Sequence, residues 1–143
     1  MKNSIKKPII SFWIISIIAF LWNVMGILEY LNTVYMTEEA LALLPNNEQN
    51  FYTNTPASVT AAFAIAVFAG TLGCVTLLLR KKLAISLLTL SMIAVFVQFG
   101  YILFIQNYMK FNGAKIIMPV LIILVAIFLV WYSKKANKDG LIS

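Results

Sequence analysis

The stretch that decides the fold is PASVTAAFAIAVFAGTLGCVTLLL (Pro56–Leu79), followed without a break by RKK (Arg80–Lys82) and LAISLLTLSMIAVFVQFGYILFI (Leu83–Ile105). Each apolar segment is at least as long as the roughly 20 residues that a helix needs to cross a hydrocarbon core. Because only a short basic run separates the two segments, they must form an antiparallel hairpin. The hairpin is therefore expected to lie in a membrane.

Two more apolar stretches flank this hairpin. They run from Pro8 to Tyr30 and from Ile116 to Tyr132. Of the 143 residues, 62% are hydrophobic and 11% are charged, whereas soluble domains carry about 25% charged residues. We therefore predict an all-α fold, an integral membrane four-helix bundle that forms one domain over residues 1–143. The predicted spans are residues 8–30, 56–79, 83–105 and 116–132.

The positive charges alternate from one side of the predicted membrane to the other. Lys110 and Lys115 lie in the loop between the third and fourth spans. The other nine of the eleven cluster before the first span, between the second and third spans, and after the fourth: Lys2, Lys6, Lys7, Arg80, Lys81, Lys82, Lys134, Lys135 and Lys138. Short loops rich in Lys and Arg stay in the cytoplasm, which predicts that both termini are cytoplasmic. The same residues would attract anionic lipid headgroups, so the net charge of +6 does not require a nucleic acid partner.

The first extracytoplasmic loop, residues 32–55, contains one helical signal. Thr37 can cap a helix, Glu38 and Glu39 suit its positive end, and Pro45 would stop it. We predict a short amphipathic helix here, with its leucines on the membrane surface or against the bundle. The polar stretch Asn46–Asn54 is predicted to be a loop, and the tail from Ala136 to be mobile.

Small residues recur along one face of the second span: Ala62, Ala66, Ala69, Gly70, Gly73 and Cys74. Small side chains at this spacing let two helix backbones approach closely in lipid, where apolar bulk gives no driving force. We interpret this small-residue stripe as a site of close helix packing that places the second span at the centre. The alternative is a helix that slides or gates.

Chemistry-bearing residues are few. The chain has no histidine, one cysteine and no run with metal-ligand spacing. Histidine is the commonest general base and a common metal ligand, and Cys74 has no basic neighbour that would make it a reactive thiolate. We therefore predict that the protein is not an enzyme and that it uses no metal and no cofactor. Glu29, at the outer edge of the first span, is interpreted as an interfacial charge.

Neutral polar side chains gather at one depth of the predicted membrane. At 1.5 Å per residue, Asn23 and Gln98 both lie about 21–23 Å from the inner edge, and Thr60 should reach a similar level from outside. One interpretation is hydrogen-bonded structural glue between helices. The other is an outward-facing cavity for a neutral polar ligand, with Trp22 and Tyr101 as flat apolar walls.

Several short runs carry a resemblance that covers nearly the whole chain. They are Trp22-Asn23, Met36-Thr37 with Glu39–Pro45, Asn54–Ala57 with Ala61–Ala64, and Gly70–Cys74 continuing to Leu79–Lys82. Together they resemble small bacterial four-span membrane proteins, frequent in Bacteroidetes and some proteobacteria, that are often labelled "sugar transporter". The resemblance implies a location in the bacterial inner membrane and favours transport. It carries over no mechanism and no binding residues.

Two functions fit these observations. The first is an accessory or interaction subunit that packs through its second helix, as a homo-oligomer or within a larger membrane complex. The second is a transporter of a small neutral polar solute, such as a sugar, that works as an oligomer because four helices enclose little volume. The small-residue stripe motivates the first hypothesis, and the polar level around Asn23 and Gln98 motivates the second.

Overall fold

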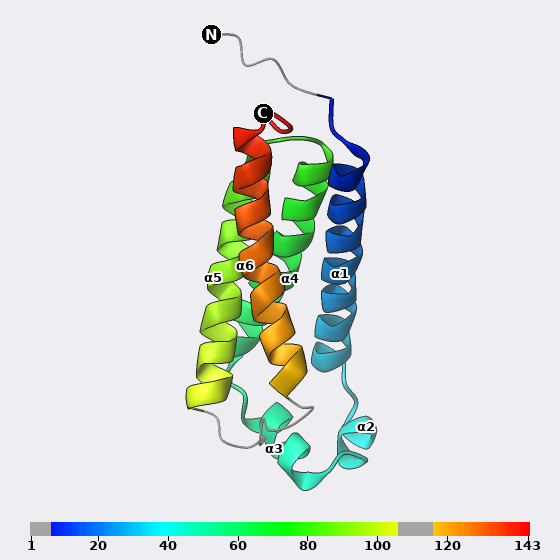
Figure 1. Cartoon of the computed structure of the whole chain (residues 1–143). Coiled ribbons are helices and arrows are strands. Elements are labelled where there is room, and N and C mark those ends of the chain that lie inside the picture. The colour runs from blue at the N-terminus through cyan, green and yellow to red at the C-terminus, as the bar shows by residue number, and fades with distance from the viewer. Residues whose placement is uncertain (1–6, 106–115) are drawn as a thin grey trace.

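The computed structural model of the chain describes residues 7–105 and 116–143, and every regular element in those ranges is a helix. The helices are α1 (Ile10–Val34), α2 (Glu38–Ala42), α3 (Asn46–Asn54), α4 (Ala57–Leu78), α5 (Leu83–Phe104) and α6 (Ile117–Lys138). In this part of the chain, α1, α4, α5 and α6 are long and apolar enough to cross a membrane. They stand side by side as a bundle (Figure 1), which confirms the predicted fold class.

The two spans of the hairpin match their predicted bounds to within one residue, whereas the outer two helices are longer than predicted. Helix α1 continues past Tyr30 to Val34, and α6 continues past Tyr132 to Lys138. Hydropathy falls where polar residues begin, but the helical hydrogen bonds continue into the polar region. The predicted ends of these two spans marked the edge of the apolar stretch rather than the end of the helix.

The long helices contact one another in a chain rather than in a closed ring. Helix α4 packs most extensively against α5 and next against α1, while α6 packs against α5. Helices α1 and α6 are not among the extensively packed pairs. They do meet at one end, where the rings of Phe12 and Tyr132 stack with centroids 6.4 Å apart.

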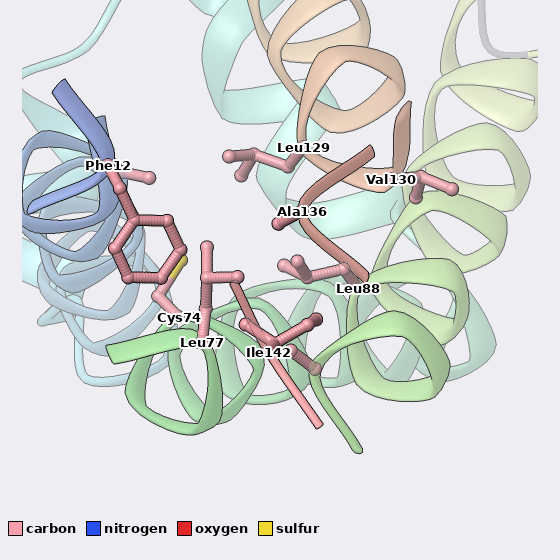
Figure 2. Packing of buried hydrophobic residues seen from close by; sticks show 10 residues of the cluster. Phe12, Cys74, Leu77, Leu88, Leu129, Val130, Ala136 and Ile142 are labelled. Carbon is pink, nitrogen blue, oxygen red and sulfur yellow. The ribbon is translucent and has the colours of Figure 1, made fainter. Parts of the chain in front are cut away.

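That end of the bundle, which we call the closed end, holds a tight apolar cluster. Phe12 of α1 and Leu77 of α4 are fully buried, and Ala136 of α6 and Ile142 beyond it are almost fully buried. Figure 2 shows these side chains converging from the helices and from the segment after α6. Helix α1 begins at this end and α6 ends there (Figure 1), so the two outer helices are joined where the cluster forms.

The segment after α6 folds back onto the bundle. At Gly140 the backbone turns left-handed, with a φ of 74°, and the Leu141 amide donates to the carbonyl oxygen of Ala136 at 2.8 Å. This pattern is the Schellman ending of a helix, in which glycine adopts the left-handed conformation without steric cost. The turn directs Ile142 into the closed end, where 2% of its surface is exposed.

Backbone hydrogen bonds then tie this tail to the turn between α4 and α5. The Ser143 amide donates to the Arg80 carbonyl and the Lys82 amide donates to the Ser143 carbonyl, each at 3.0 Å. The Arg80 guanidinium Nε donates to the Leu141 carbonyl at 2.8 Å. The prediction of a mobile tail from Ala136 was wrong, because the tail pairs with a turn that is distant in sequence.

The loop between α1 and α4 contains two short helices. Helix α2 forms where it was predicted, and the Thr37 hydroxyl accepts a hydrogen bond from the Ala40 amide at 3.1 Å. Of the leucines in this segment, Leu43 is 87% exposed, whereas Leu41 and Leu44 are half-buried. The predicted loop 46–54 was wrong: Pro45 ends one helical segment but caps the next, and Gln49 Nε2 donates back to the Leu44 carbonyl at 2.7 Å.

Candidate functional site

The small-residue stripe of α4 is buried inside the bundle. Ala62, Ala66, Ala69, Gly70, Gly73 and Cys74 are all buried. A Cβ built on Gly73 would lie 2.8 Å from the Leu88 side chain and 3.2 Å from its backbone nitrogen, so α4 and α5 nearly touch there. The close packing predicted for this stripe is present between α4 and its neighbours in the same chain.

Asn23 lies where α1 crosses this stripe. Its side-chain Nδ2 donates to the Ala19 carbonyl at 2.9 Å and to Cys74 Sγ at 3.5 Å. A Cβ on Gly70 would lie only 2.1 Å from Asn23 Oδ1, so the amide fits because Gly70 has no side chain. Asn23 thus serves the glue interpretation, with Cys74 as an acceptor rather than a nucleophile.

Ser91 links the next pair of helices at the same depth. Its hydroxyl donates to the Ala66 carbonyl of α4 at 2.6 Å, and the residue is 7% exposed. Ser91 was not among the predicted site residues. Only the α4–α5 register reveals this partner.

A cavity of about 510 Å³ lies between α1, α4, α5 and α6; we call it the inter-helix cavity. Its volume is in the range of small-molecule sites, roughly 300–1,000 Å³. The lining residues are Trp22, Asn23, Met25, Gly26, Glu29, Phe63, Ala66, Val67, Leu88, Ser91, Val95, Gln98, Phe99, Met118, Ile122, Val125, Ala126 and Leu129. Asn23 and Gln98, which were predicted to share a level, therefore face the same space.

Gln98 differs from Asn23 in having no hydrogen-bond partner among the described residues. It is 9% exposed and lines the cavity. Within residues 7–105 and 116–143, its amide makes no hydrogen bond, and Asn23 is bonded elsewhere. A buried amide without a partner is costly unless water or a ligand satisfies it. Asn23 and Gln98 therefore do not bond each other, and of the two only Asn23 bonds a neighbouring helix, through Cys74 of α4.

A second pocket of about 300 Å³, here called the outer pocket, adjoins the inter-helix cavity. Glu29, Phe63, Gln98, Phe99, Met118 and Ile122 line both spaces. The outer pocket extends to Tyr52 and Thr55 at the end of α3 and includes Thr60 of α4. Gln98 therefore lies where the two spaces meet, on the side away from the closed end.

The mouth of the outer pocket carries negative charge. Burial raises the pKa of the Tyr52 phenol above its ordinary value, and the charges of Glu29 and Glu48 raise this pKa further. Tyr52 therefore stays neutral at physiological pH and can donate a hydrogen bond. Glu29 was interpreted as a simple interfacial charge, but the structure places it on the wall of both spaces.

Of the two aromatic residues predicted to line a cavity, one does so and the other does not. Trp22 lines the inter-helix cavity, whereas Tyr101 lines neither space and packs beside the apolar cluster that contains Phe99 and Ile102. Phe63 and Phe99 provide aromatic walls that the sequence analysis missed. Ten phenylalanines are spread along the chain, and no sequence signal separates the two that face the cavity.

Groups suited to metal binding or covalent chemistry are scarce in this region. Across the part of the chain that the structure describes, no three His, Cys, Asp or Glu side chains come together as a metal site. Cys74 is free and buried. The absence of enzymatic activity stays a prediction.

Comparison with known proteins gave no match: no family model, no curated sequence and no solved structure aligns with this chain. The resemblance to four-span proteins labelled as sugar transporters therefore stays a prediction.

Proposed function

We propose that the chain is a multi-pass protein of a bacterial inner membrane that binds a small neutral molecule between its helices and carries it across the bilayer. The observation behind this proposal is the inter-helix cavity, which adjoins the outer pocket and shares with it Gln98, whose amide has no hydrogen-bond partner among the described residues. Ligand sites are typically concave, mostly apolar and equipped with a few polar groups.

The closed end supports a carrier rather than a channel. Phe12, Leu77 and Ile142 fill the bundle at the closed end. The basic residues at this end, including Arg80 to Lys82, assign it to the cytoplasm by the positive-inside rule. The conformation then corresponds to an outward-facing state, and carriage would require α1 and α6 to separate at the closed end.

The accessory-subunit hypothesis loses the observation that motivated it. The small-residue stripe is used between α4, α1 and α5, so it offers no surface to a partner. A partner would have to contact the outward-facing side chains of α4, such as Phe68 and Leu72. Such residues are expected on any lipid-facing helix, and we rank a partner-binding role second.

Thiol labelling tests the carrier proposal directly. In a Cys74→Ala background, Ile122→Cys places a thiol on the wall shared by both spaces, and Leu72→Cys places one on the lipid side as the matched control. A membrane-impermeant maleimide should label Ile122→Cys quickly from outside and more slowly from inside. Leu72→Cys should stay unlabelled from either face.

The labelling pattern separates the possible outcomes. Reaction of Ile122→Cys from neither face would overturn the proposed cavity. Reaction from the outside alone, under all conditions, would mean a binding protein that does not carry its ligand. In native membranes, crosslinking of Phe68→Cys to a second protein, with no labelling of Ile122→Cys, would favour the accessory role.

A further inference from the structure

We propose that the molecule held in the inter-helix cavity is a neutral amphiphile, with an apolar body and one hydrogen-bonding head group, and that Gln98 binds that head. This inference rests on the proposed function and adds the chemical class of the ligand. It also departs from the sugar that the sequence analysis considered.

The wall of the cavity matches an apolar body. All but four of its lining residues are apolar, and the four are Asn23, Glu29, Ser91 and Gln98. Val67 lines the cavity from α4 and Leu88 from α5, and Ile122, Val125 and Leu129 line it from α6. Burying apolar surface against such walls is favourable, whereas a hydroxyl buried there without a partner is penalised.

The polar groups of the wall leave few hydrogen bonds for a ligand. Both hydrogens of the Asn23 amide are directed to acceptors in the protein, and the Ser91 hydroxyl donates to the Ala66 carbonyl. Glu29 is exposed and lies toward the outer mouth. Gln98 is 9% exposed, and its amide makes no hydrogen bond to the described residues, so it can offer one acceptor and two donors. A sugar ring carries several hydroxyls and would leave most of them unsatisfied.

The route into the cavity also suits a lipid-soluble molecule. Helices α1 and α6 both line the cavity, yet they are not extensively packed against each other in the described part of the chain. The side of the cavity between these two helices therefore faces the bilayer without a tight seam. An amphiphile could enter there with its body in the hydrocarbon core and its head toward the level of Gln98.

Trp22 provides a reporter on the cavity wall, and Trp131 provides a matched reporter on the outside of the bundle, where it is 55% exposed. Two single-tryptophan proteins, each with the other two tryptophans changed to Phe, would be placed in liposomes. The probes are bromoundecanol and bromoundecane, which share a body and a quenching bromine and differ by the head hydroxyl. We expect saturable quenching of Trp22 and non-saturable quenching of Trp131.

The head group is tested by Gln98→Met, which keeps length and removes the amide. Loss of one hydrogen bond should weaken bromoundecanol binding about two- to ten-fold and leave bromoundecane binding unchanged. The unchanged bromoundecane value also shows that the variant is folded. An equal loss for both probes, or no loss for either, would contradict the role of Gln98.

Three further outcomes would overturn the inference. Non-saturable quenching of Trp22 would mean that the probes only partition into lipid. Equal quenching of both reporters by brominated phosphatidylcholine would mean that an ordinary acyl chain occupies the cavity. Protection of Ile122→Cys by glucose or maltose, without alcohol binding, would exclude the amphiphile and leave the proposed carrier intact.

Discussion

Gly70 and Asn23 show how strongly one atom can control a helix crossing in lipid. The side-chain oxygen of Asn23, Oδ1, occupies the space where any other residue at position 70 would place its Cβ. The amide hydrogens then reach Ala19 and Cys74, so one polar side chain is satisfied partly within its own helix and partly across the interface. Without the glycine, the amide would have to turn toward the cavity or toward lipid.

Gly70→Ala should therefore destabilise the bundle by about 1–3 kcal/mol, the usual cost of overpacking. Gly100→Ala is the matched control: it lies in a neighbouring helix, and a Cβ there would meet nothing within 4 Å. That substitution should be neutral or stabilise by up to about 1 kcal/mol. Unfolding in mixed micelles measures both, and equal effects would contradict the packing at Gly70.

The depth of Asn23 and Gln98 could be predicted because the rise per residue of a helix is fixed. The direction of each side chain could not, since it depends on the rotation of one helix against its neighbours. Asn23 fits against a glycine, whereas Gln98 faces a gap between helices. Tyr101 follows Gln98 closely in sequence and still misses the cavity.

At the scale of elements, the turn between α4 and α5 reverses the chain and also holds the tail that follows α6. Arg80 adopts a φ of 61°, and the Lys81 amide donates to the Thr76 carbonyl at 2.8 Å. A left-handed conformation costs a non-glycine residue about 1–2 kcal/mol. Arg80 offsets this cost by holding the tail through its backbone and its guanidinium.

Ile142→Ala tests whether the tail stabilises the closed end. Because Ile142 is 2% exposed, its truncation should cost about 2–4 kcal/mol, the range for buried aliphatic residues. Leu79→Ala is the matched control at the same end, since Leu79 is 63% exposed. Unfolding in bicelles compares the two, and a similar small loss for both would show that the tail is not part of the core.

Elements with local signals were predictable, and elements that depend on distant partners were not. Helix α2 was predicted from local signals: Thr37 as the cap, Glu38 and Glu39 in the first turn, and Pro45 as the stop. The docking of residues 141–143 could not be foreseen, because Gly140 indicates a helix end but not where the following chain goes. Helix α3 was missed because its polar residues favour turns, and Pro45 was read only as a stop signal.

For the whole molecule, the closed end defines an axis with two chemically different poles. Basic residues lie at the closed end, and Glu38, Glu39 and Glu48 lie in the helices at the opposite end. In the Cys74→Ala background, Asn47→Cys should react with an impermeant maleimide on right-side-out vesicles, and Asp139→Cys should react only after inversion. Reaction of both on the same side would overturn the assignment of the termini to the cytoplasm.

The extensively packed pairs are those between consecutive long helices, α1 with α4, α4 with α5 and α5 with α6, so the bundle suits synthesis in chain order. As segments leave the translocon, α4 would pack against α1, which is already in the membrane. The short α4–α5 turn would then place α5 next to α4. Helix α6 would pack last, and residues 141–143 would then form their hydrogen bonds with Arg80. If synthesis paused before α6, the cavity would lack its α6 wall and would be open to lipid. An amphiphile could enter most easily at that stage.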